Sequence, residues 1–252
     1  MSRTVNGRPE APRALAIPDM HDRLLPVIDQ QIESIGESAP HVLDLGAGEG
    51  AFSHLLQERG YRVAACDLYP EMFRCPGVEC RRADVHDELP YQDATFDAVI
   101  SIEVVEHLES QLGLFEEVGR VLKPGGQFIF TTPNIASLKS RLGFLFSGYF
   151  YSHGPLDPEV HDPVSQHIAA FTPDRYRFVL ARAGLELENV ETDKYQKTSL
   201  WLSWLAPLIW CHSRRKYGRA DGPRFENSAA TLFGRTMIGM ARKSEVQQVR
   251  AA

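Results

Sequence analysis

The stretch from Val42 to Gly50, which reads VLDLGAGEG, constrains the fold of this chain more than any other. Apolar residues lead up to an acid, Asp44, and glycines then alternate with other residues. A glycine lets the backbone turn tightly and pass close to a ligand, where a Cβ would collide. The pattern therefore predicts a strand, a tight turn and the start of a helix, which is the ligand-binding corner of an open α/β sheet.

Alternating strand and helix patterns follow along the whole chain. Strands are predicted at 41–45, 62–67, 78–84, 96–102, 127–132, 185–191 and 236–241, and helices at 19–35, 52–59, 112–122 and 173–183. This order predicts a Rossmann-like, doubly wound α/β sheet of seven strands, mostly parallel, with helices on both faces. No convincing helix separates the last two strands, so we expect an antiparallel strand pair at that edge.

Length and composition fit one domain with insertions. The chain has 252 residues, of which 43% are hydrophobic, and its net charge of −6 disfavours a uniformly basic nucleic-acid binder. Its four cysteines form no C-x-x-C pair, which indicates neither a zinc knuckle nor a disulfide framework and favours a cytoplasmic setting. We expect a flexible leader at 1–18, a single domain at 19–243 with insertions at 134–171 and 194–227, and a flexible tail at 244–252.

Acids close three successive predicted strands, and a fourth strand ends in Ser101-Ile102. Asp67 stands about twenty residues after the glycines and can accept both hydroxyls of a ribose, because a carboxylate offers two acceptor oxygens. Asp84 is placed to receive an adenine amino group. The predicted cofactor-binding residues are Asp44, Gly46, Gly48, Asp67, Leu68, Asp84, Val85, Ser101 and Ile102.

This order of motifs resembles class I S-adenosylmethionine (SAM)-dependent methyltransferases from Val42 to Lys243. The turn Lys123-Pro124-Gly125-Gly126, the strand after it and the stretch from Ala94 to Ile100 carry the resemblance as well. It implies SAM as the cofactor and methyl transfer as the activity. Gly46, Gly48 and Ala51 also fit a G-x-G-x-x-A dinucleotide fingerprint, so an NAD oxidoreductase is an alternative, although it accounts for neither Asp84 nor the KPGG turn. A glycine turn that binds no cofactor is the other alternative.

Directly after the fourth strand the chain reads Glu103-Val104-Val105-Glu106-His107. A helix starting here would put Glu103, Glu106 and His107 on one face, and two carboxylates with an imidazole suit Mg²⁺ or Mn²⁺. This E-x-x-E-H pattern resembles the O-methyltransferases of ubiquinone biosynthesis and the 2′-O-methyltransferases of small-RNA 3′ ends. In the RNA enzymes a second histidine follows downstream, and His167 stands in the comparable place. The predicted metal ligands are Glu103, Glu106, His107 and His167.

Two interpretations that need no metal remain for Glu106 and His107. His107, assisted by Glu106, can act as a general base, since an imidazole titrates near neutral pH. Both residues can also serve only as pocket walls. A metal would lower the pKa of a bound hydroxyl, which favours acceptors with two adjacent oxygens such as a catechol or a ribose diol.

The two insertions bear on the acceptor. In the first, Asn134 is the expected N-cap of an amphipathic lid helix with Lys139 and Arg141 exposed. The second contains Leu200 to Trp210, too short to span a bilayer but suited to peripheral membrane contact beside a basic cluster at Arg214 to Lys216, with Arg219 and Arg224 further on. A buried cap or a dimer contact is the alternative.

Together these features predict a SAM-dependent methyltransferase. The expected reaction is O-methylation of a small-molecule, lipid-linked or glycan-linked biosynthetic intermediate by in-line transfer, with Mg²⁺ or Mn²⁺ as a further candidate cofactor. A metal-dependent RNA 2′-O-methyltransferase and a non-catalytic SAM-binding partner subunit are the alternatives.

Overall fold

The computed structural model describes residues 4–5, 8–9, 12–17, 19–162, 164–218 and 225–245. Arg219, Arg224, most of the expected tail and part of the expected leader lie outside the described residues. Within the leader, β1 (Thr4–Val5) and β2 (Arg8–Pro9) pair in antiparallel fashion.

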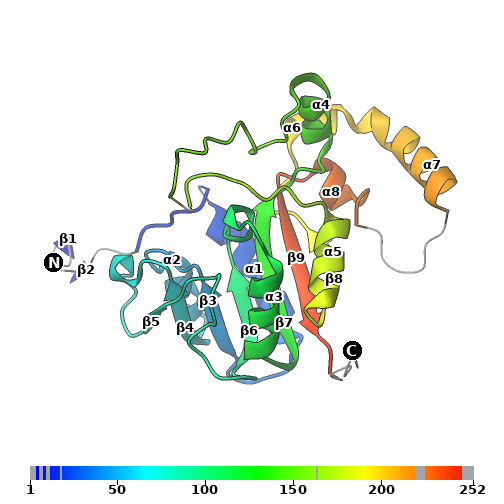
Figure 1. The fold of residues 1–252 in the computed structure, drawn as a ribbon. Helices are drawn as coiled ribbons and strands as arrows, with labels where there is room; N and C mark the ends of the chain where they lie inside the picture. The colour runs from blue at the N-terminus through cyan, green and yellow to red at the C-terminus, as the bar shows by residue number, and fades with distance from the viewer. Residues whose placement is uncertain are drawn as a thin grey trace.

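The centre of the molecule is a seven-stranded sheet with the order β5-β4-β3-β6-β7-β9-β8 (Figure 1). The strands are β3 (His41–Leu45), β4 (Arg62–Asp67), β5 (Cys80–Arg82), β6 (Phe96–Ser101), β7 (Leu122–Pro133), β8 (Leu185–Glu191) and β9 (Thr236–Lys243). The pairings from β5 to β7 are parallel, and β9 runs antiparallel to both β7 and β8. This confirms the predicted fold. The strand order reverses between β3 and β6, which is where such sheets bind ligands.

Helices cover both faces of the sheet and create two cores. On one face α1 (Met20–Glu33) and α2 (Ala51–Glu58) pack on Val42, Ile100 and Ile129. On the other, α3 (Leu112–Val121) and α5 (Pro173–Arg182) pack on side chains from the alternate strand positions, such as Leu43, Val99 and Phe128. Successive strand residues point to opposite faces, so strands covered on both sides are apolar throughout.

The insertions and the segment before β9 build a helical cap beyond the carboxyl ends of the parallel strands (Figure 1). It comprises α4 (Leu138–Ser147), α6 (Lys197–Trp201), the 3₁₀ turn η3 (Ser203–Leu205), α7 (Ala206–Tyr217) and α8 (Ala229–Phe233). Its own small core consists of Leu138, Leu202, Ala206 and Leu232. In the described part of the chain, no helix combines the length and the apolar character needed to cross a membrane.

The first cap helix begins later than predicted, and Asn134 is not its N-cap. Ser137 is the N-cap, and its hydroxyl accepts a hydrogen bond from the Ser140 amide. Asn134 is buried, and its side-chain amide donates to the Thr231 and Gly234 carbonyls instead. The exposure predicted for Arg141 is wrong too, because its guanidinium is partly buried and donates to the carbonyls of Ala136 and Glu226.

Replacing Phe115 by Ala tests the larger core. Phe115 is fully buried, with ring centroids 5.7 Å from Phe128 and 6.0 Å from Phe130. We expect Phe115→Ala to lower the free energy of unfolding by about 3–5 kcal/mol in urea titrations. The control Phe178→Ala, whose side chain on α5 is 51% exposed, should cost no more than about 1 kcal/mol. Equal losses would contradict this packing.

Candidate functional site

The glycine corner is tied to the neighbouring strand through backbone hydrogen bonds. The amides of Gly46 and Ala47 both donate to the Cys66 carbonyl at the end of β4, at 2.9 and 3.2 Å. Gly46 has φ +79°, and a Cβ on it would lie 2.4 Å from a methyl carbon of Val104. The Gly48 amide donates to an Asp67 carboxylate oxygen at 2.8 Å. The turn after β3 is thus held in one conformation by Cys66 and Asp67 at the end of β4.

A pocket of about 800 Å³ opens at this corner, at the carboxyl ends of β3, β4 and β6. Of the predicted cofactor-binding residues, Asp44, Gly46, Gly48, Asp67, Leu68, Asp84, Val85 and Ile102 line it. Ser101 does not, because its side chain is fully buried beneath the pocket in β6. The structure therefore brings together residues predicted from four separate strand ends.

The pocket also uses residues that the sequence analysis did not single out. Arg13 and Leu15 line it, although they belong to the expected flexible leader. The Arg13 amide donates to the Glu49 carboxylate at 3.0 Å, and Leu15 lies 3.0 Å from where a Cβ on Gly48 would be. The short apolar run from Leu15 to Ile17 within a polar segment is the signal that could have revealed this contact.

The three acids at the strand ends have different surroundings. Asp44 is buried and accepts a hydrogen bond from the Ser53 hydroxyl at 2.6 Å, and its burial raises its pKa to about 6. Both Asp67 oxygens accept backbone amides, from Gly48 and Tyr69, which leaves one lone pair on each for a ligand hydroxyl. Asp84 is more exposed, and hydrogen bonds from His86 lower its pKa.

The helix expected to begin at Glu103 does not form. Glu103 has φ +55°, and only a single 3₁₀ turn, η2 (Val105–His107), follows. The Glu103 amide donates to the Thr131 hydroxyl on β7 at 3.0 Å, and that hydroxyl lies 3.1 Å from the Glu103 carboxylate. These contacts hold Glu103 at the pocket wall beside β7, so it does not share a helix face with Glu106 and His107 as predicted.

Three of the four predicted metal ligands do converge. One ligand atom each from Glu106, His107 and His167 can be chosen so that all lie within 4.8 Å of one another, and Glu103 is not among them. The two imidazole rings meet edge to face with centroids 4.9 Å apart. His107 and His167, sixty positions apart in the chain, therefore lie side by side in the pocket wall, with Glu106 next to them.

The ring orientations leave the outer nitrogens available. Nδ1 of His107 lies 2.9 Å from the Gln166 carbonyl, and Nδ1 of His167 lies 2.9 Å from the Ser152 carbonyl. A carbonyl only accepts, so each ring donates from Nδ1 and keeps a lone pair on Nε2. Burial lowers the pKa of both histidines, which favours neutral rings.

Glu106 is the most deeply placed member. Its side chain is fully buried, and neither carboxylate oxygen has a partner within 3.5 Å at good hydrogen-bond geometry among the described residues. Burial, and then the nearby charge of Glu103, raise its pKa well above the usual range, against the smaller opposing effects of its own backbone amide and the Thr132 hydroxyl. A buried carboxylate with so little hydrogen bonding is costly unless a proton or a cation accompanies it. This donor set, one carboxylate and two neutral imidazoles, therefore fits a divalent cation.

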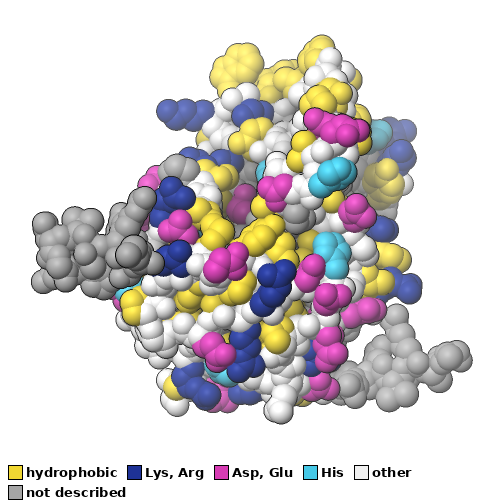
Figure 2. Space-filling model, turned by 60° about the vertical axis from the view of Figure 1, so that its left-hand side comes forward, with side chains coloured by type: hydrophobic (Ala, Val, Ile, Leu, Met, Phe, Trp, Pro, Cys, Tyr) yellow, Lys and Arg dark blue, Asp and Glu magenta, His cyan; other side chains and the backbone are white. Residues whose placement is uncertain are grey.

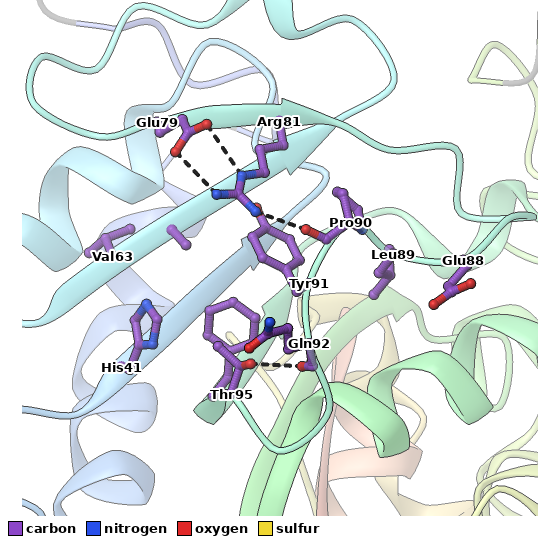
Figure 3. Close-up of a pocket in the computed structure, with 12 residues that line it drawn as sticks. His41, Val63, Glu79, Arg81, Glu88, Leu89, Pro90, Tyr91, Gln92 and Thr95 are labelled. Atoms are coloured by element: carbon purple, nitrogen blue, oxygen red, sulfur yellow. Dashed lines mark hydrogen bonds and ion pairs between the residues drawn. The ribbon is translucent and has the colours of Figure 1, made fainter.

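A second hollow of similar volume lies at the opposite end of the sheet (Figure 3). It is lined by the first residues of β3, β4 and β6, including His41 and Phe96. Arg81 sits over the Tyr91 ring there, and its guanidinium donates to the Glu79 carboxylate and the Pro90 carbonyl. Its charge is thus already paired, and none of the predicted site residues reaches this end.

Comparisons with known proteins agree with the geometry. A family described as a methyltransferase domain matches residues 43–130. A ubiquinone biosynthesis O-methyltransferase of Xylella fastidiosa is 29% identical over 178 residues, which cover 67% of this chain and 70% of the relative. A demethylmenaquinone methyltransferase of Tropheryma whipplei is 31% identical over 94 residues, 35% of this chain and 39% of the relative.

The fold is also found in a SAM-dependent methyltransferase from Archaeoglobus fulgidus. That structure superposes with a TM-score of 0.58 at 20% identity, and the match covers 88% of this chain and 92% of the other. The strand order, the glycine corner and these matches define a Rossmann-like methyltransferase. The chain therefore carries a methyltransferase domain and has the fold of class I SAM-dependent methyltransferases.

Gly46→Ala tests whether the glycine corner binds the cofactor. The new Cβ would meet Val104, whereas Gly60, with φ +85°, has nothing within 4 Å of an added Cβ. Both substitutions carry a left-handed backbone penalty of about 1–2 kcal/mol. We expect only Gly46→Ala to weaken S-adenosylhomocysteine binding, by at least about tenfold in calorimetric titration. Equal affinity of the two variants would contradict the assignment.

Glu103→Gln tests the electrostatics of the pocket wall. Burial raises the pKa of Glu103 to about 7, against the smaller opposing effects of Thr131 and Arg235. The folded wild type then holds a proton that the unfolded chain has lost, so this group's contribution to stability falls as pH rises from about 4.5 to 7. Relative to wild type, Glu103→Gln should gain about 2 kcal/mol between pH 5 and pH 8 in urea unfolding. A pH-independent difference would show that Glu103 is ionised throughout.

Proposed function

We propose that this methyltransferase transfers the SAM methyl group to a hydroxyl oxygen of a small-molecule, lipid-linked or glycan-linked intermediate, assisted by Mg²⁺ or Mn²⁺. The observation that carries the proposal is the cluster of Glu106, His107 and His167, whose ligand atoms lie within 4.8 Å of one another; both histidines line the pocket, and Glu106 is buried. The similarity to a ubiquinone biosynthesis O-methyltransferase supports an oxygen acceptor.

Acidic side chains at the strand ends would bind and orient the cofactor. SAM supplies a methyl group on a cationic sulfonium. Asp67 has free lone pairs for ribose hydroxyls, Asp84 stands where an adenine amino group would be received, and Gly46 and Gly48 leave room for the ligand against the backbone. Asp44 and Glu103 add negative potential to the pocket, and a cationic ligand would favour their ionised forms.

We assign proton removal to the cluster of Glu106, His107 and His167. In-line transfer needs an acceptor oxygen aligned behind the methyl carbon, and its hydroxyl proton has to leave. A divalent cation held by Glu106, His107 and His167 would lower the pKa of the acceptor hydroxyl. Where no cation binds, the free Nε2 of His107 is placed to accept the proton instead.

The acidic lining favours a small acceptor over RNA. Six carboxylates line the pocket, against one Arg, among the residues that the structure describes. An RNA 2′-O-methyltransferase has to hold a phosphate backbone, and its affinity rests largely on Lys and Arg contacts. The local charge thus argues against the RNA alternative in the same direction as the net charge of −6.

Calorimetric titration of Mn²⁺ into the protein saturated with S-adenosylhomocysteine tests the proposal. We expect one site that is lost, by at least about 100-fold in affinity, in Glu106→Gln/His107→Ala. The matched control is His54→Ala/Glu58→Gln, which removes another His and Glu pair, at partly exposed positions of α2 that do not line the pocket, and should leave binding unchanged. Absence of a Mn²⁺ site in the wild type would contradict metal assistance and leave His107 as the base.

A further inference from the structure

The two insertions, far apart in sequence, converge on one exposed apolar surface. The α4 helix and α6 pack together, and the Lys139 amide at the start of α4 donates to the Ser199 hydroxyl of α6 at 3.2 Å. We call their outer side the cap surface. It comprises Phe144, Leu145, Phe146 and Tyr149 from the first insertion and Leu200, Trp201, Trp204, Leu208, Trp210 and Tyr217 from the second.

The cap leaves several of its large apolar side chains exposed. Phe146 is 81% exposed, Trp201 80% and Leu145 73%, whereas the small core beneath them has four buried members. Figure 2 shows hydrophobic side chains gathered at the top of the molecule, where Figure 1 places α4 and α6. Contiguous exposed patches of large aromatic and aliphatic side chains are rare on monomers and mark contact sites.

The charge around the cap surface indicates what it contacts. From Lys194 to Ala220 the sequence has six Lys or Arg residues and no Asp or Glu, in a chain whose net charge is −6. Arg214, Arg215 and Lys216 are exposed in the last turn of α7, next to Trp210 and Tyr217. Tryptophans on the apolar side with Lys and Arg beside them are typical of helices that lie in the interface of an anionic bilayer.

The α7 helix is held to the rest of the cap by a few contacts. Those in the middle of the helix are hydrogen bonds. The Trp210 indole donates to the Asn227 carbonyl at 2.8 Å, and the Asn227 amide donates to the Ser213 hydroxyl at 3.2 Å. Ala206 and Ile209 contact the small core, and Trp210, although half-exposed, is held on the same side of the helix by its bond to Asn227, while Leu208 is exposed on the opposite side. The helix is therefore anchored along one side and presents the other.

We propose that the cap surface binds the headgroup region of an anionic phospholipid bilayer. The aromatic and leucine side chains enter the interface, and Arg214, Arg215 and Lys216 lie over the lipid phosphates. The cap lies beyond the carboxyl ends of the parallel strands (Figure 1), which is the end of the sheet where the pocket opens, so binding places the pocket end of the molecule toward the membrane. This inference does not depend on the acceptor or on the metal.

The chain carries its own probe for this contact. Its three tryptophans are Trp201, Trp204 and Trp210, all on the cap surface, so tryptophan emission reports on this surface alone. With vesicles of phosphatidylcholine containing about one third phosphatidylglycerol we expect cosedimentation, a blue shift of emission and quenching by brominated lipid. Pure phosphatidylcholine vesicles should bind at least about tenfold more weakly, and salt near 0.5 M should reverse most binding.

Two sets of substitutions keep the tryptophans and separate the apolar from the electrostatic contribution. Leu145→Ser/Phe146→Ser/Leu208→Ser removes exposed apolar groups, and Arg214→Glu/Arg215→Glu/Lys216→Glu reverses the basic cluster. Each should lower the affinity for anionic vesicles at least about tenfold. The control Phe178→Ser/Arg182→Glu changes the same residue types on α5 and should bind as wild type does. Unchanged S-adenosylhomocysteine binding shows that each variant is folded.

Three results would overturn the proposal. One is a wild-type protein that neither cosediments with anionic vesicles nor is quenched by brominated lipid, a readout that needs no variant. Another is an equal loss of binding in the control. The third is a dimer in vesicle-free solution, seen by sedimentation equilibrium with blue-shifted emission, that the apolar triple variant dissociates, because the cap surface would then be an interface between two copies.

Discussion

The site depends on one carbonyl oxygen. The main-chain carbonyl of Glu106 accepts the amides of both Ile168 and Ala169, each at 2.9 Å, and so ties the turn after β6 to a loop about sixty residues further along the chain. The next residue repeats the connection, since the His107 ring donates to the Gln166 carbonyl. These three hydrogen bonds place His167 against His107 and Glu106. Without them the cluster would be two separate segments, and the pocket would lack one of its walls.

The price of this arrangement is the burial of carboxylates. Asp44 and Glu103 line the pocket, Glu106 is buried near Glu103, and burial raises the pKa of each. Such a group of acids destabilises the ligand-free protein at neutral pH unless protons or cations accompany it. A sulfonium at one end of the pocket and a divalent cation at the other would supply that charge. The same residues that lower the stability of the ligand-free protein would thereby raise its affinity for a cationic ligand. Groups with perturbed pKa values often cluster at functional sites for this reason.

Much of this could be predicted from the sequence because it rests on local pattern. Strand periodicity and the VLDLGAGEG corner are short-range signals, and they predicted the sheet and eight of the residues that line the pocket. The conformation of Glu103 could not be predicted, because it depends on the Thr131 hydroxyl, which reaches it from β7. The packing of Leu15 over Gly48 and the outward aromatic side of α4 likewise depend on tertiary contacts. Asn134 was predicted to be an N-cap because of its residue type. Its actual partners, the carbonyls of Thr231 and Gly234, lie about one hundred residues away in the chain, and no local pattern could reveal them.

We propose that the turn after β6 and the His167 loop together form a metal-assisted methyl-transfer site. Anomalous diffraction from crystals grown with Mn²⁺ and S-adenosylhomocysteine tests it most directly. We expect one anomalous peak within bonding distance of the Glu106 carboxylate and of Nε2 of both His107 and His167, with the nucleoside bound at Asp44, Asp67 and Asp84. A nucleoside at that corner with no peak at the cluster, or a peak held by other residues, would contradict it.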